Sequence, residues 1–440
     1  MFRIVFLCTV LAAFVSPVRA ERTLTDTEWL IRLSVQPMAA PKPALRYLLL
    51  PELKEMTPGN PIPNYLKCFM EQRDFMPGGE TLSKAALRQA DRAARLDKPD
   101  WQILLKLRTD GVGLLLPDLQ NMRFLTLELR NRFHDEVVRG RFDDALRTAK
   151  TMFALSRHMG EHPTLIGDLV GMSLAQITIY TLEEMLEQPG CPNLYWALTN
   201  LPDPLISVSK GLEGERVMIS AELRDLNDRE SMSPGQIKKL IAHIDKLRQL
   251  EGGSGQSKEN TRTWLNARTK DEKAVEAARH RLVEYGIAEE RLAKFPADQV
   301  ILLDEKQKSE IHRDEEMKLT NLPTWEIVAL TAQDKPAKEP ALFDFLVPAM
   351  QKVHQAQGRS KRFIALLRHV EALRLYAAEH EGKLPEKLSD IDVPLPVDPF
   401  TGKPFLYKRE GETTHLRGRP PRGYEKFPYL NIHYEITIRK

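Results

Sequence analysis

The sequence predicts a mainly α-helical protein with a small C-terminal α+β module, and three observations carry this prediction. Apolar residues recur at helical spacing across residues 23–204, where clusters of proline and glycine cut the pattern into helices of ordinary length. Residues 210–322 are richer in charge and poor in aromatic side chains, which is typical of long solvated helices. Residues 434–439 alternate apolar and polar side chains, which indicates a half-buried strand.

The first twenty residues have the three parts of a secretory signal peptide. Arg3 gives a cationic start, residues 4–15 form an apolar run, and residues 16–20 end in a small residue, so that cleavage is expected after Ala20. The apolar run is too short to favour a transmembrane anchor. We therefore expect an exported protein, periplasmic or extracellular, whose mature chain begins at Glu21.

The mature chain is nearly neutral, because loss of Arg3 and Arg19 with the signal leaves 62 basic residues against 61 acidic ones. This balance gives no indication of a nucleic-acid partner. A chain of this length ordinarily forms two or three domains. The changes in composition predict a signal peptide (1–20), a helical-hairpin domain (21–205), a charged helical arm (206–330) and an α+β module (331–440).

Two cysteines remain after signal cleavage, Cys68 and Cys191, because Cys8 leaves with the signal. A disulfide can persist in an oxidising compartment, and pairing would staple the helical-hairpin domain. Two buried free thiols are the alternative. Both interpretations stand at this stage.

The helical-hairpin domain contains one recognisable reversal between helices. A helix is expected from 117 to 139, and residues 140–146, Gly-Arg-Phe-Asp-Asp-Ala-Leu, then open a second helix that runs through His158. This turn resembles the turn of a tetratricopeptide repeat, where glycine allows the reversal and alanine permits close helix approach. A single copy supports helical hairpins rather than a peptide-binding groove.

The next expected helix, 164–187, is the most apolar of the mature chain. Gly167, Gly171 and Ala175 lie at four-residue spacing, which in lipid would suggest a dimerising membrane helix. Asp168 interrupts the run, so we expect a buried central helix and no stable membrane span after signal cleavage.

The charged arm is expected to consist of helices at 233–250 and 263–285, joined by the glycine-rich segment 251–257. In the first helix the apolar residues form one stripe among lysine, aspartate and arginine. Such helices form a solvated hairpin or, alternatively, a partner-binding surface.

The C-terminal module is expected to begin with a long helix, 342–380, followed by a glycine–proline turn at 382–385 and a second turn at 398–407 that leads into a strand. These elements resemble the globular part of type II secretion pseudopilins over about 50 residues. The resemblance implies the local fold of the module, and implies neither a filament nor a calcium site.

Over its whole length the chain resembles a set of uncharacterised exported proteins of planctomycete bacteria. The phrases that carry this resemblance are residues 50–60, 160–167 and 189–198, together with the C-terminal module. The resemblance implies an exported, mostly helical protein and transfers no activity.

One string matches a catalytic pattern: His158-Met-Gly-Glu161-His162 has the H-x-x-E-H form of inverted zinc peptidases. Two imidazoles on one helical turn can share zinc, with the glutamate as general base for the bound water. Gly160 and Pro163 weaken the helix at this point, so the alternative is a helix end with a polar turn.

The function expected from the sequence is a non-enzymatic structural or protein-interaction role in the cell envelope, with an unknown protein partner and no cofactor. A zinc-dependent hydrolase that uses His158, Glu161 and His162 is the alternative.

Overall fold

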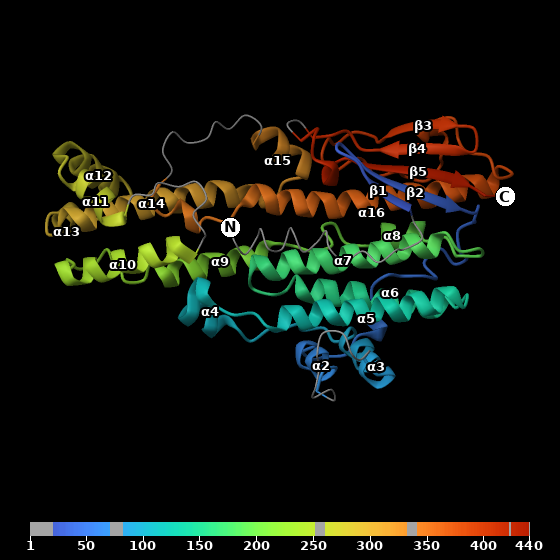
Figure 1. The fold of residues 1–440 in the computed structure, drawn as a ribbon, viewed down its shortest axis with the longest axis horizontal. Helices are drawn as coiled ribbons and strands as arrows, with labels where there is room; N and C mark the ends of the chain where they lie inside the picture. Colours follow the sequence, from blue (N-terminus) through green and yellow to red (C-terminus); the bar gives the residue numbers. More distant parts are fainter. Residues whose placement is uncertain (1–20, 71–81, 251–259, 332–340, 422–423, 440) are drawn as a thin grey trace.

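The computed structural model describes residues 21–70, 82–250, 260–331, 341–421 and 424–439. The predicted signal peptide and the segment 251–257 lie outside these residues. In Figure 1 a small sheet lies on the long helix α16, which in turn lies over α7 and α8, and the hairpin α5–α6 forms the next layer. Helices α10 to α14 extend from this body as an arm. The protein is mainly helical with a small sheet, as the sequence predicts.

The sheet joins the first described residues of the chain to the last. Its strands lie in the order β1-β2-β5-β4-β3, and β2 pairs with β5 in parallel, with Ile31 opposite Tyr434. The bounds of the strands are β1 Glu21–Leu24, β2 Trp29–Val35, β3 Leu406–Glu410, β4 Thr413–Arg417 and β5 Ile432–Ile438.

The prediction of helices from residue 23 onward was therefore wrong for β1 and β2, which are strands of the sheet that β3 to β5 complete. In β2 the buried residues are Ile31, Leu33 and Val35, which recur with the period of two that a strand requires. Their hydrogen-bonding partner is the last strand of the chain, so local sequence carries little sign of the pairing.

The helical body is built around the hairpin and the apolar helix that the sequence predicts. The chain reverses between α5 and α6 at Gly140, whose φ of +69° is a conformation that favours glycine. Helix α7 is long and apolar enough to cross a membrane, and 72% of its apolar window is buried inside the protein. The helices of this body are α2 Ile62–Lys67, α3 Lys84–Ala93, α4 Leu104–Asp110, α5 Asp118–Val138, α6 Phe142–Met159, α7 Leu165–Leu186 and α8 Tyr195–Thr199, with η1 Leu53–Glu55 and η2 Gly111–Gly113.

The arm has a hydrophobic core of its own, distinct from the core of the body. The second predicted helix, 263–285, is broken in two, because the Asp271 side chain accepts hydrogen bonds from the amides of Lys273 and Ala274 and caps a new helix. The elements here are α9 Ser209–Glu222, α10 Pro234–Leu250, α11 Thr261–Thr269, α12 Glu272–Glu284, α13 Glu289–Leu292, α14 Ala297–Met317 and η3 Lys318–Asn321.

The long C-terminal helix begins at Met350 rather than at residue 342, because Pro348 interrupts helical geometry just before it. The remaining elements are α15 Thr324–Thr331, η4 Asp344–Leu346, α16 Met350–Glu379, η5 Leu388–Asp390 and η6 Pro428–Leu430. A buried ion pair fixes the C-terminal loops on α16: Arg362 Nε and Nη2 donate to Asp398 Oδ1 and Oδ2 at 2.9 and 2.8 Å.

Candidate functional site

The two histidines of the H-x-x-E-H string have separate partners. Helix α6 ends at Met159, so His158 lies in its last turn while His162 lies beyond it, just before α7. His158 Nδ1 is 3.0 Å from the Tyr65 hydroxyl, and His162 Nδ1 is 2.8 Å from the Thr164 hydroxyl. Thr164 caps α7, so His162 belongs structurally to the next helix.

Glu161 does not join these histidines in a ligand set. It is exposed and forms an ion pair of 3.2 Å with Lys210 at the start of α9. Burial lowers the pKa of both imidazoles to about 4, so both rings are neutral at pH 7. Across the described ranges no group of three histidine, cysteine, aspartate or glutamate side chains is placed to hold a metal ion. The single-turn zinc geometry that the alternative requires is thus not formed, because α6 ends at Met159, between the two rings.

Cys68 and Cys191 do not form the disulfide that was one of the two alternatives. Cys68 and Cys191 are buried free thiols in different hydrophobic clusters. The Cys68 thiol donates a hydrogen bond of 3.3 Å to the Ala86 carbonyl. The backbone carbonyl of Cys191 accepts a hydrogen bond of 2.7 Å from Arg374. Burial raises the pKa of the Cys68 thiol to about 11, which makes it a packing residue rather than a nucleophile.

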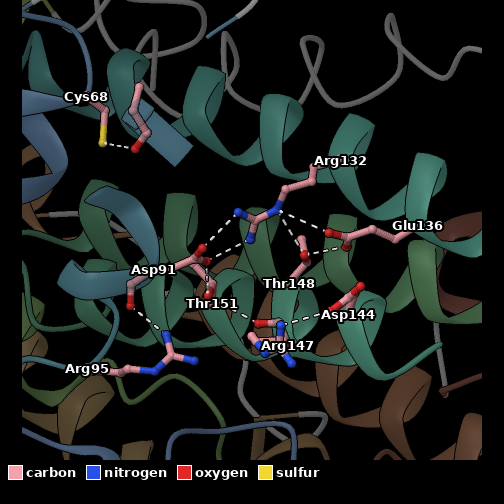
Figure 2. Close-up of polar contacts among 10 residues, drawn as sticks. Cys68, Asp91, Arg95, Arg132, Glu136, Asp144, Arg147, Thr148 and Thr151 are labelled. Atoms are coloured by element: carbon pink, nitrogen blue, oxygen red, sulfur yellow. Dashed lines mark hydrogen bonds and ion pairs between the residues drawn. The ribbon is translucent and has the colours of Figure 1, made fainter. Parts of the chain in front are cut away.

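A polar network joins three helices of the body, and no motif in the sequence predicted it. Figure 2 shows Arg132 of α5 facing Asp91 of α3, with which it makes two hydrogen bonds of 2.9 and 2.7 Å. Arg132 Nε also donates to Thr148 of α6 at 3.0 Å, and the Thr148 hydroxyl donates to Glu136 at 2.6 Å. These side chains satisfy one another, so the network fixes helix packing and offers no free nucleophile.

Asp168 is a buried carboxyl group at the crossing of α7 and α9. Its side chain is inaccessible to solvent, and neither carboxyl oxygen has a hydrogen-bond partner among the described residues. Burial, reinforced by the nearby Glu215 and Glu161, raises its pKa to about 9. The helices approach so closely that a Cβ at Gly211 would lie 2.1 Å from Asp168 Oδ2. The group is therefore a neutral acid at pH 7.

Residues of α4 and α9 line a surface groove. In Figure 1 these two helices lie where the arm leaves the body. It has a volume of about 420 Å³, with Val217 and Ala221 among its lining residues. Three arginines also line it: Arg108 from α4, and Arg216 and Arg224 from α9. Arg216 has an ion pair of 3.6 Å with Asp314, and Arg224 donates to the carbonyls of Ala221 and Thr109. Asp314 neutralises one of the three guanidinium groups, so the groove keeps a positive charge.

Exposed leucines stand beside this groove. Leu104 and Leu105 are 59% and 74% exposed, and they precede Arg108 by four and three residues, on the same side of α4. Leu115, just after η2, is 84% exposed. We call the groove together with Leu104 and Leu105 the arginine–leucine surface. Apolar and cationic side chains side by side on a solvent-facing surface are typical of protein-binding sites.

Helix α4 is held on α9 through Gly111. Glu222 of α9 accepts hydrogen bonds from the Val112 amide at 2.7 Å and pairs with His243 Nε2 of α10 at 2.8 Å. Gly111 has a φ of +54°, and a Cβ there would lie 1.9 Å from Glu222 Oε1. This local turn therefore sets the shape of the groove.

Replacing Gly111 by alanine is expected to lower the free energy of unfolding by about 1–3 kcal/mol, because alanine is strained at this φ and its methyl group displaces Glu222. Urea unfolding followed by circular dichroism measures the loss. Gly113 is the matched control, since a Cβ there meets no atom within 4 Å. An equal loss for both variants would contradict the prediction.

No protein-family model, no curated protein and no solved structure matched this chain in the three comparisons with known proteins.

Proposed function

We propose that this chain is an exported, non-enzymatic protein that binds a protein partner in the cell envelope through the arginine–leucine surface. The observation that carries the proposal is the coincidence of an arginine-lined groove with two exposed leucines on α4. Arginine is among the residues that contribute most binding energy at protein interfaces, and adjoining exposed apolar side chains mark interaction sites on protein surfaces.

The chemistry of the surface defines the kind of partner. Leu104 and Leu105 are mostly exposed, so a partner that removes them from water lowers the free energy of the complex. Guanidinium groups favour carboxylates, with which they form paired hydrogen bonds. The partner segment is therefore an acidic, amphipathic helix or strand of another envelope protein.

Export is supported by the sequence of residues 1–20, which has the three parts of a secretory signal peptide. The likeness of the C-terminal module to pseudopilin globular domains, and of the chain to exported planctomycete proteins, belongs to the same proposal. Of these two resemblances, the one to exported planctomycete proteins favours an envelope location, and the one to pseudopilins concerns the local fold of the module.

Site-specific photo-crosslinking in the native cell tests the binding surface. A photoreactive amino acid in place of Leu105 is expected to form a covalent adduct with one acidic envelope protein. The same amino acid at Leu53, which is 91% exposed and lies outside the groove, is the matched control. Equal adducts at both positions, or none at Leu105, would refute the proposed surface.

Charge reversal tests the role of the arginines. In the crosslinking background, Arg108→Glu combined with Arg216→Glu is expected to reduce the adduct yield about tenfold, because like charges then face each other across the interface. Raising the ionic strength should also reduce the yield with the unmodified arginines, since exposed charges are screened by salt. A yield that responds to neither change would leave no electrostatic role for the groove.

A further inference from the structure

A second cavity is lined by residues of α15, α16 and the C-terminal loops. In Figure 1, α15 lies on the opposite side of the molecule from α4. Its volume is about 120 Å³. Helix α15 contributes Ile327 and Val328 to one wall, and Phe400 and Leu430 form the other. Apart from Val328, these apolar residues are at most 6% exposed. The cavity is thus a partly open chamber with two apolar walls. Its other lining residues are His354, Pro421 and the polar residues Thr324, Thr331, Gln351, Gln355 and Tyr424.

One buried polar atom in the chamber has no partner. His354 of α16 lines the cavity and is 5% exposed, and its Nε2 has no hydrogen-bond partner among the described residues. Buried polar groups in folded proteins almost always have a partner, so a free imidazole nitrogen beside a cavity points to a missing one. Burial lowers the pKa of His354, so the ring presents a neutral nitrogen.

The α16 backbone closes one end of the chamber. Gly358 follows His354 by one helical turn, and a Cβ there would lie 2.8 Å from both the Phe400 ring and the Thr324 methyl group. The walls therefore meet at Gly358. Gln351, one turn before His354, is exposed and marks the open end. A ligand would enter past Gln351 and reach the imidazole with its polar end.

The walls also restrict the charge and size of a ligand. None of the residues that line the cavity carries a full charge at pH 7, and Arg362, behind the Phe400 ring, is already paired with Asp398. An ion would lose its hydration without compensation here. At about 120 Å³ the chamber is smaller than the cavity of about 150 Å³ that holds benzene, so a short aliphatic chain fits inside it and a single ring fits with one edge in the open end at Gln351.

We infer that this chamber binds a small uncharged alcohol of one ring or a few carbons, such as a phenol, with its hydroxyl group on His354 Nε2. A hydroxyl group can both donate and accept, so it pairs with either tautomer of a neutral imidazole. The apolar remainder of the ligand packs against Ile327, Val328 and Phe400. This inference is independent of the proposed partner surface, which lies elsewhere.

Phenol and toluene are the two probes, because they have nearly the same shape and only phenol has a hydroxyl group. In calorimetric titration of the mature protein, phenol is expected to bind at least about tenfold more tightly than toluene. In spectra of ¹³C-histidine-labelled protein, phenol should shift the His354 signal. His369, on the same helix with its Nδ1 on the Ala365 carbonyl at 2.8 Å, should not respond. Equal affinities, or a His354 signal unchanged at millimolar phenol, would overturn the inference.

Two variants separate the hydrogen bond from the cavity. His354→Leu should bind phenol and toluene with equal affinity, because the nitrogen is gone while the apolar walls remain. Val328→Trp should bind neither, because the indole fills the space, whereas Val283→Trp, at an exposed site on the arm, should bind as the unmodified protein does. Thermal melts establish that each variant is folded. Retention by His354→Leu of the preference for phenol would also overturn the assignment.

Discussion

Replacing Asp398 by alanine is expected to lower the free energy of unfolding by about 3–5 kcal/mol, the largest effect of any substitution considered for this protein. Arg362 is completely buried, and Asp398 is 1% exposed. Their two hydrogen bonds are supplemented by donation from Arg362 to the Leu430 carbonyl and, at 3.1 Å, to the Arg419 carbonyl. Without the carboxylate, a guanidinium charge stays buried with only neutral partners.

Asp398 also has a local role that adds to this loss. Its Oδ1 accepts a hydrogen bond of 3.1 Å from the Phe400 amide, and its carbonyl accepts one of 2.8 Å from the Gly402 amide. Gly402 has a φ of +63°, so the turn depends on glycine as well as on the aspartate. The ion pair and the turn together hold the C-terminal loops against α16.

Urea unfolding followed by circular dichroism measures the effect. The control is Asp135→Ala, which breaks an ion pair with Arg139 in which both side chains are 65% exposed and which should cost less than about 1 kcal/mol. The double variant Arg362→Met with Asp398→Leu should recover part of the loss, because no unpaired charge then remains buried. A loss of less than about 1 kcal/mol for Asp398→Ala would contradict the role of the pair.

The second large effect is expected at Asp168, where asparagine should stabilise the protein by up to about 4 kcal/mol at pH 7. The pKa of this carboxyl group is about 9 in the folded protein, well above the value of about 3.9 in an unfolded chain. At pH 7 the folded state therefore holds a proton that the unfolded state releases. Asparagine has nearly the same shape and does not titrate, so the free energy of unfolding no longer includes the release of this proton.

The pH dependence has a definite sign. Stability from the neutral Asp168 is complete below about pH 4 and is lost as the pH rises towards about 9, because the unfolded carboxyl group ionises first. The slope from this group is about 1.4 kcal/mol per pH unit within that window. In Asp168→Asn the slope should disappear.

Urea unfolding at pH 5, 6, 7 and 8 for the unmodified protein and Asp168→Asn gives the slope directly. Asp135→Asn is the matched control, because that carboxylate is exposed on α5 and should leave the slope unchanged. Parallel pH profiles for the unmodified protein and Asp168→Asn would show that Asp168 is ionised in the folded state. That outcome would contradict the burial argument.

The sequence alone was sufficient for the features that depend on neighbouring residues. The hairpin α5–α6, the apolar helix α7 and the stripe of α10 lie where helical periodicity and the turn at Gly140 predicted them. The helix cap at Asp271 is also a local feature, because this side chain accepts hydrogen bonds from amides two and three residues further along the chain. For the candidate site, glycine and proline around the H-x-x-E-H string correctly indicated a helix end.

Only the tertiary structure decided the features whose partners are remote in the chain. Strand β2 is a strand because β5 supplies its hydrogen bonds, and Arg374 donates to the Gln36 carbonyl across 338 positions of sequence. The groove of Arg108 with Arg216 and the chamber at His354 likewise combine residues from separate elements. Helical periodicity depends on residues three or four positions apart, so the sequence is sufficient to predict it. The remote pairings form only when separate apolar faces pack together in the folded chain and bring distant polar groups into contact.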